Sequence, residues 1–367
     1  MNFREKPIRC LYFIILPVVV GIISWIMQGL FRPLCACDVN LGCGDCNPTN
    51  LLSSIFGILL ILSIISIIVL LNSCIGMKNP DRPIPEENET GTFITVRDGI
   101  EIFVYEYAPV RDFKNTIYII SGITGINHKS EKDIIELLSN NKNRIVAIHP
   151  RGTGYSEGIR GDSPDLSDFI ADYVDIIKDD KYYQESTRKI ILFGHSMSCA
   201  FAIKVACELQ KTDGLILVNP PYRLKKAKGM TPVLGDYLKY IGYFIFAPHL
   251  PVVNMSGDPS IINNDSDRKE SELRSNDSLL VKYFSMRYMT ESKKIMDAMV
   301  KNGQQADFPL LLLYGENDNI VDKSGCDEIY YAWKGKNKNY VIIKGGSHGK
   351  STVVKGAEII IKWIENI

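Results

Sequence analysis

The sequence predicts an α/β domain with a mostly parallel central sheet, preceded by two membrane-spanning helices. Two observations lead to this class. Two long stretches without charged residues come first, and from residue 93 onward short apolar runs alternate with amphipathic helical stretches. Such alternation is typical of a parallel sheet covered by helices on both faces. The chain has 367 residues, 46% of them hydrophobic, which is enough to bury a full-sized core.

Residues 11–31 and 51–71 contain no Asp, Glu, Lys or Arg. A helix that crosses the hydrocarbon core of a bilayer needs roughly 20 apolar residues, so each stretch is long enough. The first is too long for the apolar part of a cleaved signal peptide, and the second follows closely. We therefore expect residues 1–75 to form a membrane hairpin whose partner is the lipid bilayer.

Basic residues flank the two predicted spans unevenly. They are Arg4, Lys6 and Arg9 before the first span, Arg32 between the spans, and Lys78 and Arg82 after the second. An excess of Lys and Arg marks the cytoplasmic side of a membrane protein. We expect an integral membrane protein with both ends, and therefore the large domain, in the cytoplasm.

The predicted loop between the spans, residues 32–50, is rich in cysteine. It contains Cys35, Cys37, Cys43 and Cys46. Two disulfides are the simplest expectation if the loop faces an oxidising compartment. Four thiolates could instead hold a zinc ion, although this spacing is not a sharp zinc pattern, and a tight loop with free thiols is a third possibility.

Residues 76–92 are rich in proline, asparagine and acidic residues, which is typical of a linker. As a flexible coil this segment would span about 20 Å. We therefore expect a tether that keeps the following domain, residues 93–367, close to the bilayer surface.

The large domain begins with an alternating segment around Arg97-Asp98-Gly99, which predicts a β-hairpin. Six continuous apolar runs of strand length follow, at residues 116–121, 144–150, 189–194, 214–220, 309–315 and 340–345. Helical stretches separate most of them, for example at residues 132–140 and 166–178. Together these predict a mixed sheet of about eight strands with helices on both faces.

Residues 221–307 interrupt this alternation. The interval has no comparable strand run, and its helix candidates are residues 232–250 and 276–289. A connection this long inside a compact domain is usually functional. We expect a helical cap over the carboxyl edge of the sheet.

The apolar run at residues 189–194 leads into Gly194-His195-Ser196-Met197-Ser198 and then a helical stretch. A G-x-S-x-G turn of this kind exposes a serine at the edge of a sheet, where it can act as a nucleophile. The last position is serine rather than glycine. Serine is small, so we expect it to be tolerated where the strand and helix approach closely.

A catalytic serine needs a base to take its proton and an acid to orient that base. Asp318 follows the run at residues 309–315, with Asp322 as an alternative acid, and His348 lies between glycines after the last run. These residues have the order that such a site requires. His128 is expected at the surface or, alternatively, lining the pocket.

Four segments together resemble the α/β-hydrolase superfamily: FGHSMS, AIHPRGTGYSEG, LLLYGENDNIVD and GGSHG. The nearest branch contains monoacylglycerol lipases, lysophospholipases and serine aminopeptidase-like (S33) hydrolases. The resemblance covers residues 92–367. It implies an α/β-hydrolase fold, with Ser196 as nucleophile, Asp318 as acid and His348 as base.

The same resemblance implies an oxyanion hole made of two backbone N–H groups. One is that of Met197, which directly follows the nucleophile. The family usually has His-Gly after its third strand, and the next residue supplies the second donor. Here Ser121-Gly122 stands in that place, so Ile123 is the candidate.

These observations predict a membrane-anchored serine hydrolase that cleaves an ester, thioester or amide bond without cofactor or metal. An acyl lipid such as a monoglyceride or lysophospholipid is the expected small acyl substrate. A serine aminopeptidase-like peptidase and a non-catalytic scaffold are the alternatives. The 42 basic residues balance 42 acidic ones, so nothing in the charge points to nucleic acid.

Overall fold

A computed structural model of the chain describes residues 81–225, 240–255 and 265–367 apart from residues 88, 126 and 246, together with Asn79 and five helical positions between 57 and 63. Apart from these five positions, the predicted membrane hairpin lies outside the described residues, and so do its four cysteines. Within the described part, no helix is both long and apolar enough to cross a bilayer. The chain divides into two compact units, residues 1–78 with 231–252 and residues 79–230 with 253–367.

The second unit is built on an eight-stranded sheet, and the predicted number of strands is confirmed. The strands are β1 (Thr92–Thr95), β2 (Glu101–Tyr107), β3 (Asn115–Ile119), β4 (Arg144–Ile148), β5 (Lys189–His195), β6 (Gly214–Val218), β9 (Leu310–Gly315) and β10 (Lys338–Ile343). Their order is β1-β2-β4-β3-β5-β6-β9-β10. The predicted hairpin pairs β1 with β2, and β2 is also antiparallel to β4, whereas all other pairs are parallel.

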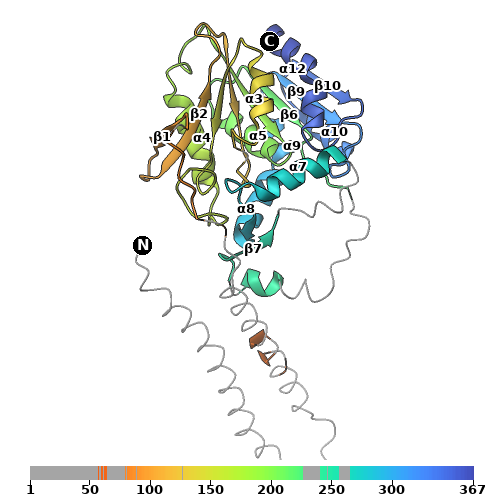
Figure 1. The fold of residues 1–367 in the computed structure, drawn as a ribbon. Coiled ribbons are helices and arrows are strands. Elements are labelled where there is room, and N and C mark those ends of the chain that lie inside the picture. Colours follow the sequence, from red (N-terminus) through yellow and green to blue (C-terminus); the bar gives the residue numbers. More distant parts are fainter. Residues whose placement is uncertain are drawn as a thin grey trace, which may run out of the picture. The chain divides into compact units, whose positions relative to one another are not determined.

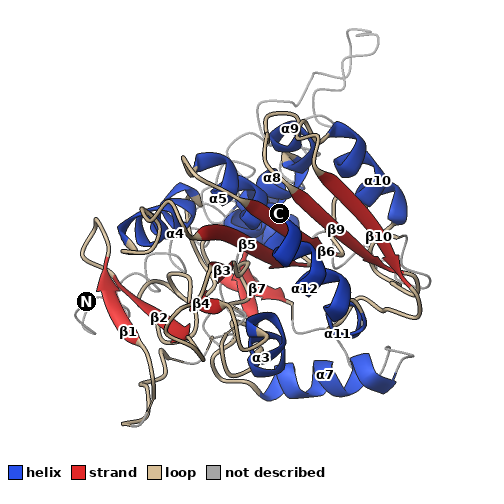
Figure 2. Ribbon diagram, turned by 90° about the horizontal axis from the view of Figure 1, so that it is seen from above, coloured by secondary structure: helices blue, strands red, loops and turns tan. Residues whose placement is uncertain are grey.

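Helices cover both faces of this sheet (Figures 1 and 2). One face carries α3 (Lys132–Ser139), α11 (Ser351–Lys355) and α12 (Ala357–Asn366), and the other carries α4 (Ser167–Asp179), α5 (Ser198–Glu208), α8 (Met286–Asp297), α9 (Met299–Gly303) and α10 (Lys323–Ala332). Successive strand residues enter opposite cores: Tyr118 packs under α4, whereas Ile117 and Ile119 pack under α3. Two buried faces explain why these strands are continuous apolar runs.

The interval at residues 221–307 differs from the sequence prediction. It contains two short strands, β7 (Pro251–Asn254) and β8 (Tyr283–Ser285), which form a second sheet. The predicted helix over residues 276–289 is wrong, because α7 (Asp265–Asn276) ends at the first of these residues and α8 begins only at Met286. The Ser285 side chain accepts a hydrogen bond from the Tyr288 N–H and so fixes the start of α8. Both α8 and α9 contact α5.

The described residues directly before β1, Asn79, 81–87 and 89–91, form no helix or strand. The expected free coil is wrong for these residues, because several of them are bound to the domain. The Asn79 side chain accepts hydrogen bonds from the N–H groups of Lys282 and Tyr283 at 3.1 and 2.9 Å. The Arg82 guanidinium donates to the Tyr155 carbonyl at 2.7 Å and pairs with Glu157 at 2.9 Å. Residues far apart in the sequence therefore hold this segment in place.

Glu89 of the same segment ends a chain of buried hydrogen bonds. The Tyr155 N–H donates to His149 Nδ1 at 3.1 Å, so His149 carries its proton on Nε2 and donates to His128 Nδ1 at 3.0 Å. His128 then donates from Nε2 to Glu89 at 2.8 Å. Burial lowers the pKa of both histidines, in agreement with two neutral rings. His128 is thus buried, and the expectation of a surface position is wrong.

Candidate active site

The candidate nucleophile lies on a sharp turn between β5 and α5. Ser196 has a φ of 55°, in the left-handed region that side chains other than glycine rarely adopt. Its N–H donates to the Val218 carbonyl at 2.9 Å. A Cβ atom at Gly194 would lie 2.9 Å from the Cys199 Cα, so residue 194 must be glycine for α5 to approach the strand. The backbone therefore presents the serine at the sheet edge.

The structure brings three predicted residues together at this edge. Ser196 Oγ lies 2.8 Å from His348 Nε2, and His348 Nδ1 lies 2.8 Å from Asp318 Oδ2. Ser196 follows β5, Asp318 follows β9 and His348 follows β10. Parallel strands end at the same edge of a sheet, which explains how residues so distant in sequence meet.

Asp318 is buried and held in one orientation. Its Oδ1 accepts hydrogen bonds from the N–H groups of Ile320 and Val321, each at 2.8 Å. Burial alone would raise the pKa of Asp318, but the hydrogen bond with His348 and these backbone donors outweigh it and keep the pKa below its usual value. Asp322, the alternative acid, instead caps α10 by accepting from the Ser324 N–H at 2.9 Å.

The loop that carries His348 is held by two residues at the ends of neighbouring strands. His195 Nε2 donates to the His348 carbonyl at 2.7 Å, and burial lowers the pKa of His195, which favours this neutral ring. Asn219 directly follows β6. Its amide donates to the Ser347 carbonyl at 2.9 Å and accepts from the Gly315 N–H at 2.8 Å.

Sequence reasoning missed Asn219, which connects β6, β9 and the histidine loop. An available signal was a lone asparagine immediately after a buried strand. Asparagine tolerates the left-handed backbone found here, where φ is 50°.

The two candidate oxyanion donors come from different loops. No described residue accepts a hydrogen bond from the N–H of Met197 or of Ile123. The Ile123 side chain is fully buried, and the preceding Gly122 N–H donates to Ser198 Oγ at 2.9 Å. Neither candidate N–H group is therefore committed to another acceptor within the described residues.

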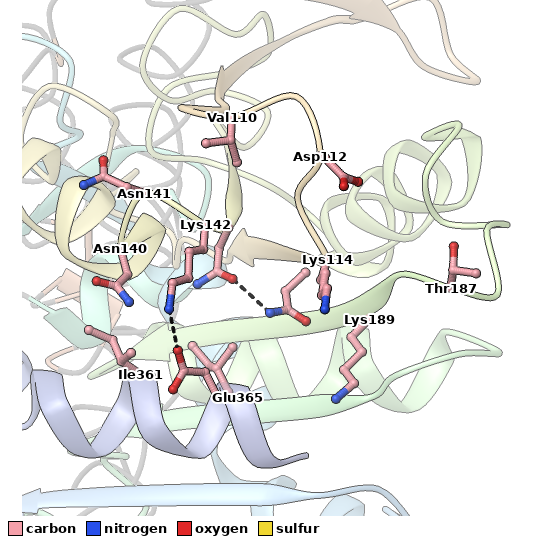
Figure 3. A pocket seen from close by; sticks show the side chains of 13 residues that line it. Val110, Asp112, Lys114, Asn140, Asn141, Lys142, Thr187, Lys189, Ile361 and Glu365 are labelled. Carbon is pink, nitrogen blue, oxygen red and sulfur yellow. Dashed lines mark hydrogen bonds and ion pairs between the residues drawn. The ribbon is translucent and has the colours of Figure 1, made fainter.

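A cavity of about 710 Å³ lies elsewhere in this unit (Figure 3). Its lining includes Asn115 and Lys189, the first residues of β3 and β5, so it lies at the amino edge of the sheet. Asn115 donates to Asn143 within it. None of Ser196, Asp318 and His348 lines this cavity, so it is not the space beside the candidate nucleophile. Within the described part of the chain, no cluster of His, Cys, Asp and Glu is arranged to hold a metal ion.

This sheet and the placement of the three side chains define an α/β-hydrolase, and the predicted α/β-hydrolase fold of the large domain is confirmed. A family model described as serine aminopeptidase, S33, matches residues 111–350, and the chain belongs to that family. No curated protein matches the chain in sequence.

Solved structures of the same fold include lipases and an esterase. A soluble variant of monoglyceride lipase from Saccharomyces cerevisiae, in complex with a substrate analogue, has a TM-score of 0.61 at 16% identity, covering 78% of this chain and 99% of that one. The monoacylglycerol lipase of Paleococcus ferrophilus has a TM-score of 0.56 at 20% identity, with 72% and 99% covered. The esterase EaEST from Exiguobacterium antarcticum has a TM-score of 0.53 at 15% identity, with 75% and 100% covered. Identities this low show the fold alone.

Proposed function

We propose that the protein is a membrane-anchored serine hydrolase that cleaves the ester bond of an acyl lipid. The observation that carries this proposal is the pair of 2.8 Å contacts from Ser196 through His348 to Asp318. A serine hydroxyl becomes a useful nucleophile when an oriented imidazole can take its proton.

In the proposed reaction His348 Nε2 takes the proton of Ser196 as Oγ attacks the substrate carbonyl. Asp318 accepts a hydrogen bond from the His348 Nδ1–H and stabilises the imidazolium that forms. The N–H groups of Met197 and Ile123 bind the negatively charged oxygen of the tetrahedral intermediate. His348 then protonates the leaving alcohol, and water activated by the same imidazole releases the acyl group from Ser196.

A monoglyceride or lysophospholipid is the proposed substrate class. Two lines of support are the apolar stretches expected to hold the enzyme beside a bilayer and the fold shared with two monoacylglycerol lipases. The family description favours a second candidate, a peptidase that cleaves amide bonds. Both candidates use the same nucleophile, so the acyl group and leaving group must be tested separately.

A fluorophosphonate probe tests the nucleophile in the full-length protein. We expect covalent labelling of the wild type and of Ser278→Ala, a change at an exposed serine, and no labelling of Ser196→Ala. If the folded wild-type protein is not labelled, the proposed nucleophile is contradicted and the chain is a non-catalytic scaffold. Wild-type protein that has not been treated with the probe is then given monoacylglycerols, p-nitrophenyl esters of several chain lengths and aminoacyl amides. Faster cleavage of long-chain esters supports the lipid substrate, whereas faster amide cleavage favours the peptidase.

The membrane hairpin is part of the proposal, with spans at residues 11–31 and 51–71 and the catalytic domain in the cytoplasm. We expect the full chain to stay in the membrane pellet after alkaline carbonate extraction, because apolar helices of this length are held by the bilayer rather than by charge. A chain lacking residues 1–75 serves as the control and should be released. Release of the full chain would contradict the anchor, and digestion of the domain by protease added to intact cells would contradict its cytoplasmic side.

A further inference from the structure

One hydrogen bond links a position at which the chain departs from the usual pattern of α/β-hydrolases to the neighbour of a second such position. Ser198 stands where the G-x-S-x-G turn ends in glycine, and Ser121 stands where the loop after the third strand usually has histidine. In the structure the Gly122 N–H, directly after Ser121, donates to Ser198 Oγ at 2.9 Å. This contact joins the nucleophile turn to the opposite loop.

The bond lies between the two candidate oxyanion donors. Ile123 directly follows Gly122, and Met197 directly precedes Ser198. A Cβ atom at Gly122 would lie 3.5 Å from the Ser198 nitrogen and 3.6 Å from the Met197 Cγ, so the two loops are in close contact. A change in the distance between Gly122 and Ser198 therefore changes the distance between the two donors.

Other hydrogen bonds also hold this loop, and within it the Gly125 N–H donates to the Gly122 carbonyl at 3.1 Å. The Ser121 N–H donates to the Tyr173 hydroxyl at 2.9 Å, and the Val281 N–H donates to the Thr124 carbonyl at 3.0 Å. Both partners come from other elements, α4 and the segment before β8. The hydrogen bond to the Ser198 hydroxyl joins Gly122 to the nucleophile turn, and Ser198 is only 2% exposed.

We propose that Ser198 is a positioning residue for the oxyanion hole, whose hydroxyl fixes the Ser121–Gly122 peptide and thereby places the adjoining Ile123 N–H at the distance that the transition state requires. The proposal rests on the hydrolase function proposed above. A donor that binds the developing oxyanion acts more strongly in the transition state than on the bound substrate. Losing its alignment should therefore lower kcat while KM changes little.

The test compares Ser198→Ala and Ser198→Gly with the wild type in the full-length protein, using a p-nitrophenyl ester. Glycine is the usual residue at this position of the G-x-S-x-G turn, so we expect Ser198→Gly to keep the backbone conformation of the turn. We expect kcat to fall about 10- to 100-fold in both variants. This loss is smaller than the one caused by removing an oxyanion donor outright, because the donor is still present. KM should stay within about twofold of the wild-type value. Affinity for a trifluoromethyl ketone, which forms an oxyanion on Ser196, should fall by a similar factor.

Ser156→Ala is the matched control. Ser156 is also buried and its Oγ also accepts a backbone N–H bond, from Phe103 at 2.9 Å, but it is not part of the candidate site. Wild-type kcat in a folded Ser198 variant, or an equal loss of kcat in Ser156→Ala, would overturn the positioning role. Full activity in Ser196→Ala would instead overturn the proposed function, so the two failures are distinguishable.

Discussion

Replacing Ser196 with glycine is expected to abolish ester hydrolysis while raising the free energy of unfolding by about 1 kcal/mol. The φ of 55° at this position costs about 1–3 kcal/mol for a residue with a Cβ atom. Glycine removes that cost but loses more conformational entropy on folding, by about 0.5–1 kcal/mol. Without the hydroxyl there is no nucleophile, so kcat should fall by at least about 10⁴-fold.

Urea unfolding and p-nitrophenyl ester turnover measure the two effects on the same protein samples. Ser196→Ala is the control, because it also lacks the nucleophile but keeps the Cβ atom and therefore the backbone strain. We expect it to be equally inactive and no more stable than the wild type. A glycine variant less stable than the alanine variant would show that the turn stores no strain.

Asp318→Asn is expected to lower kcat by about 10⁴-fold while the protein remains folded. The N–H groups of Ile320 and Val321 point at Oδ1 and would hold the amide oxygen of the new side chain there. The amide NH₂ would then face His348 Nδ1, in place of the carboxylate oxygen now 2.8 Å away. His348 would have to accept at Nδ1 and carry its proton on Nε2, where it could no longer take the proton of Ser196.

The same substitution should change how stability depends on pH. The pKa of Asp318 is below its usual value in the folded protein, so its ionised form stabilises the fold above the unfolded pKa of about 3.9. That contribution is lost as the pH falls through the folded pKa. In Asp318→Asn the drop in unfolding free energy between pH 6 and pH 3 should be smaller than in the wild type. Asp322→Asn is the control for activity. Asp322 caps α10 and makes no hydrogen bond with His348 in the described structure, so kcat of this variant should be nearly unchanged.

Local patterns predicted the sheet well. Each of β3, β4, β5, β6 and β9 is a short run of apolar residues, because helices bury both of its faces. The candidate triad was also predictable, since the order of its residues after successive strands decides which side chains share an edge.

Contacts between distant residues account for what the sequence did not predict. The hydrogen bond between Gly122 and Ser198 joins positions 76 apart, and neither residue alone indicates it. His128 appears polar in sequence, yet its buried position follows from a partner ring 21 residues away and a carboxylate 39 residues away. At residues 276–289 the apolar spacing suggested a helix, but extended pairing in β8 and the cap at Ser285 prevailed.

The attachment of Asn79, Arg82 and Glu89 decides where a shortened chain can begin. A protein cut just before β1 would keep the whole central sheet, yet it would leave the His128 ring without the carboxylate that accepts its proton. It would also uncover the backbone N–H groups of Lys282 and Tyr283, which Asn79 now satisfies. A shortened chain that keeps these contacts must therefore begin at or before Asn79, ahead of the first strand.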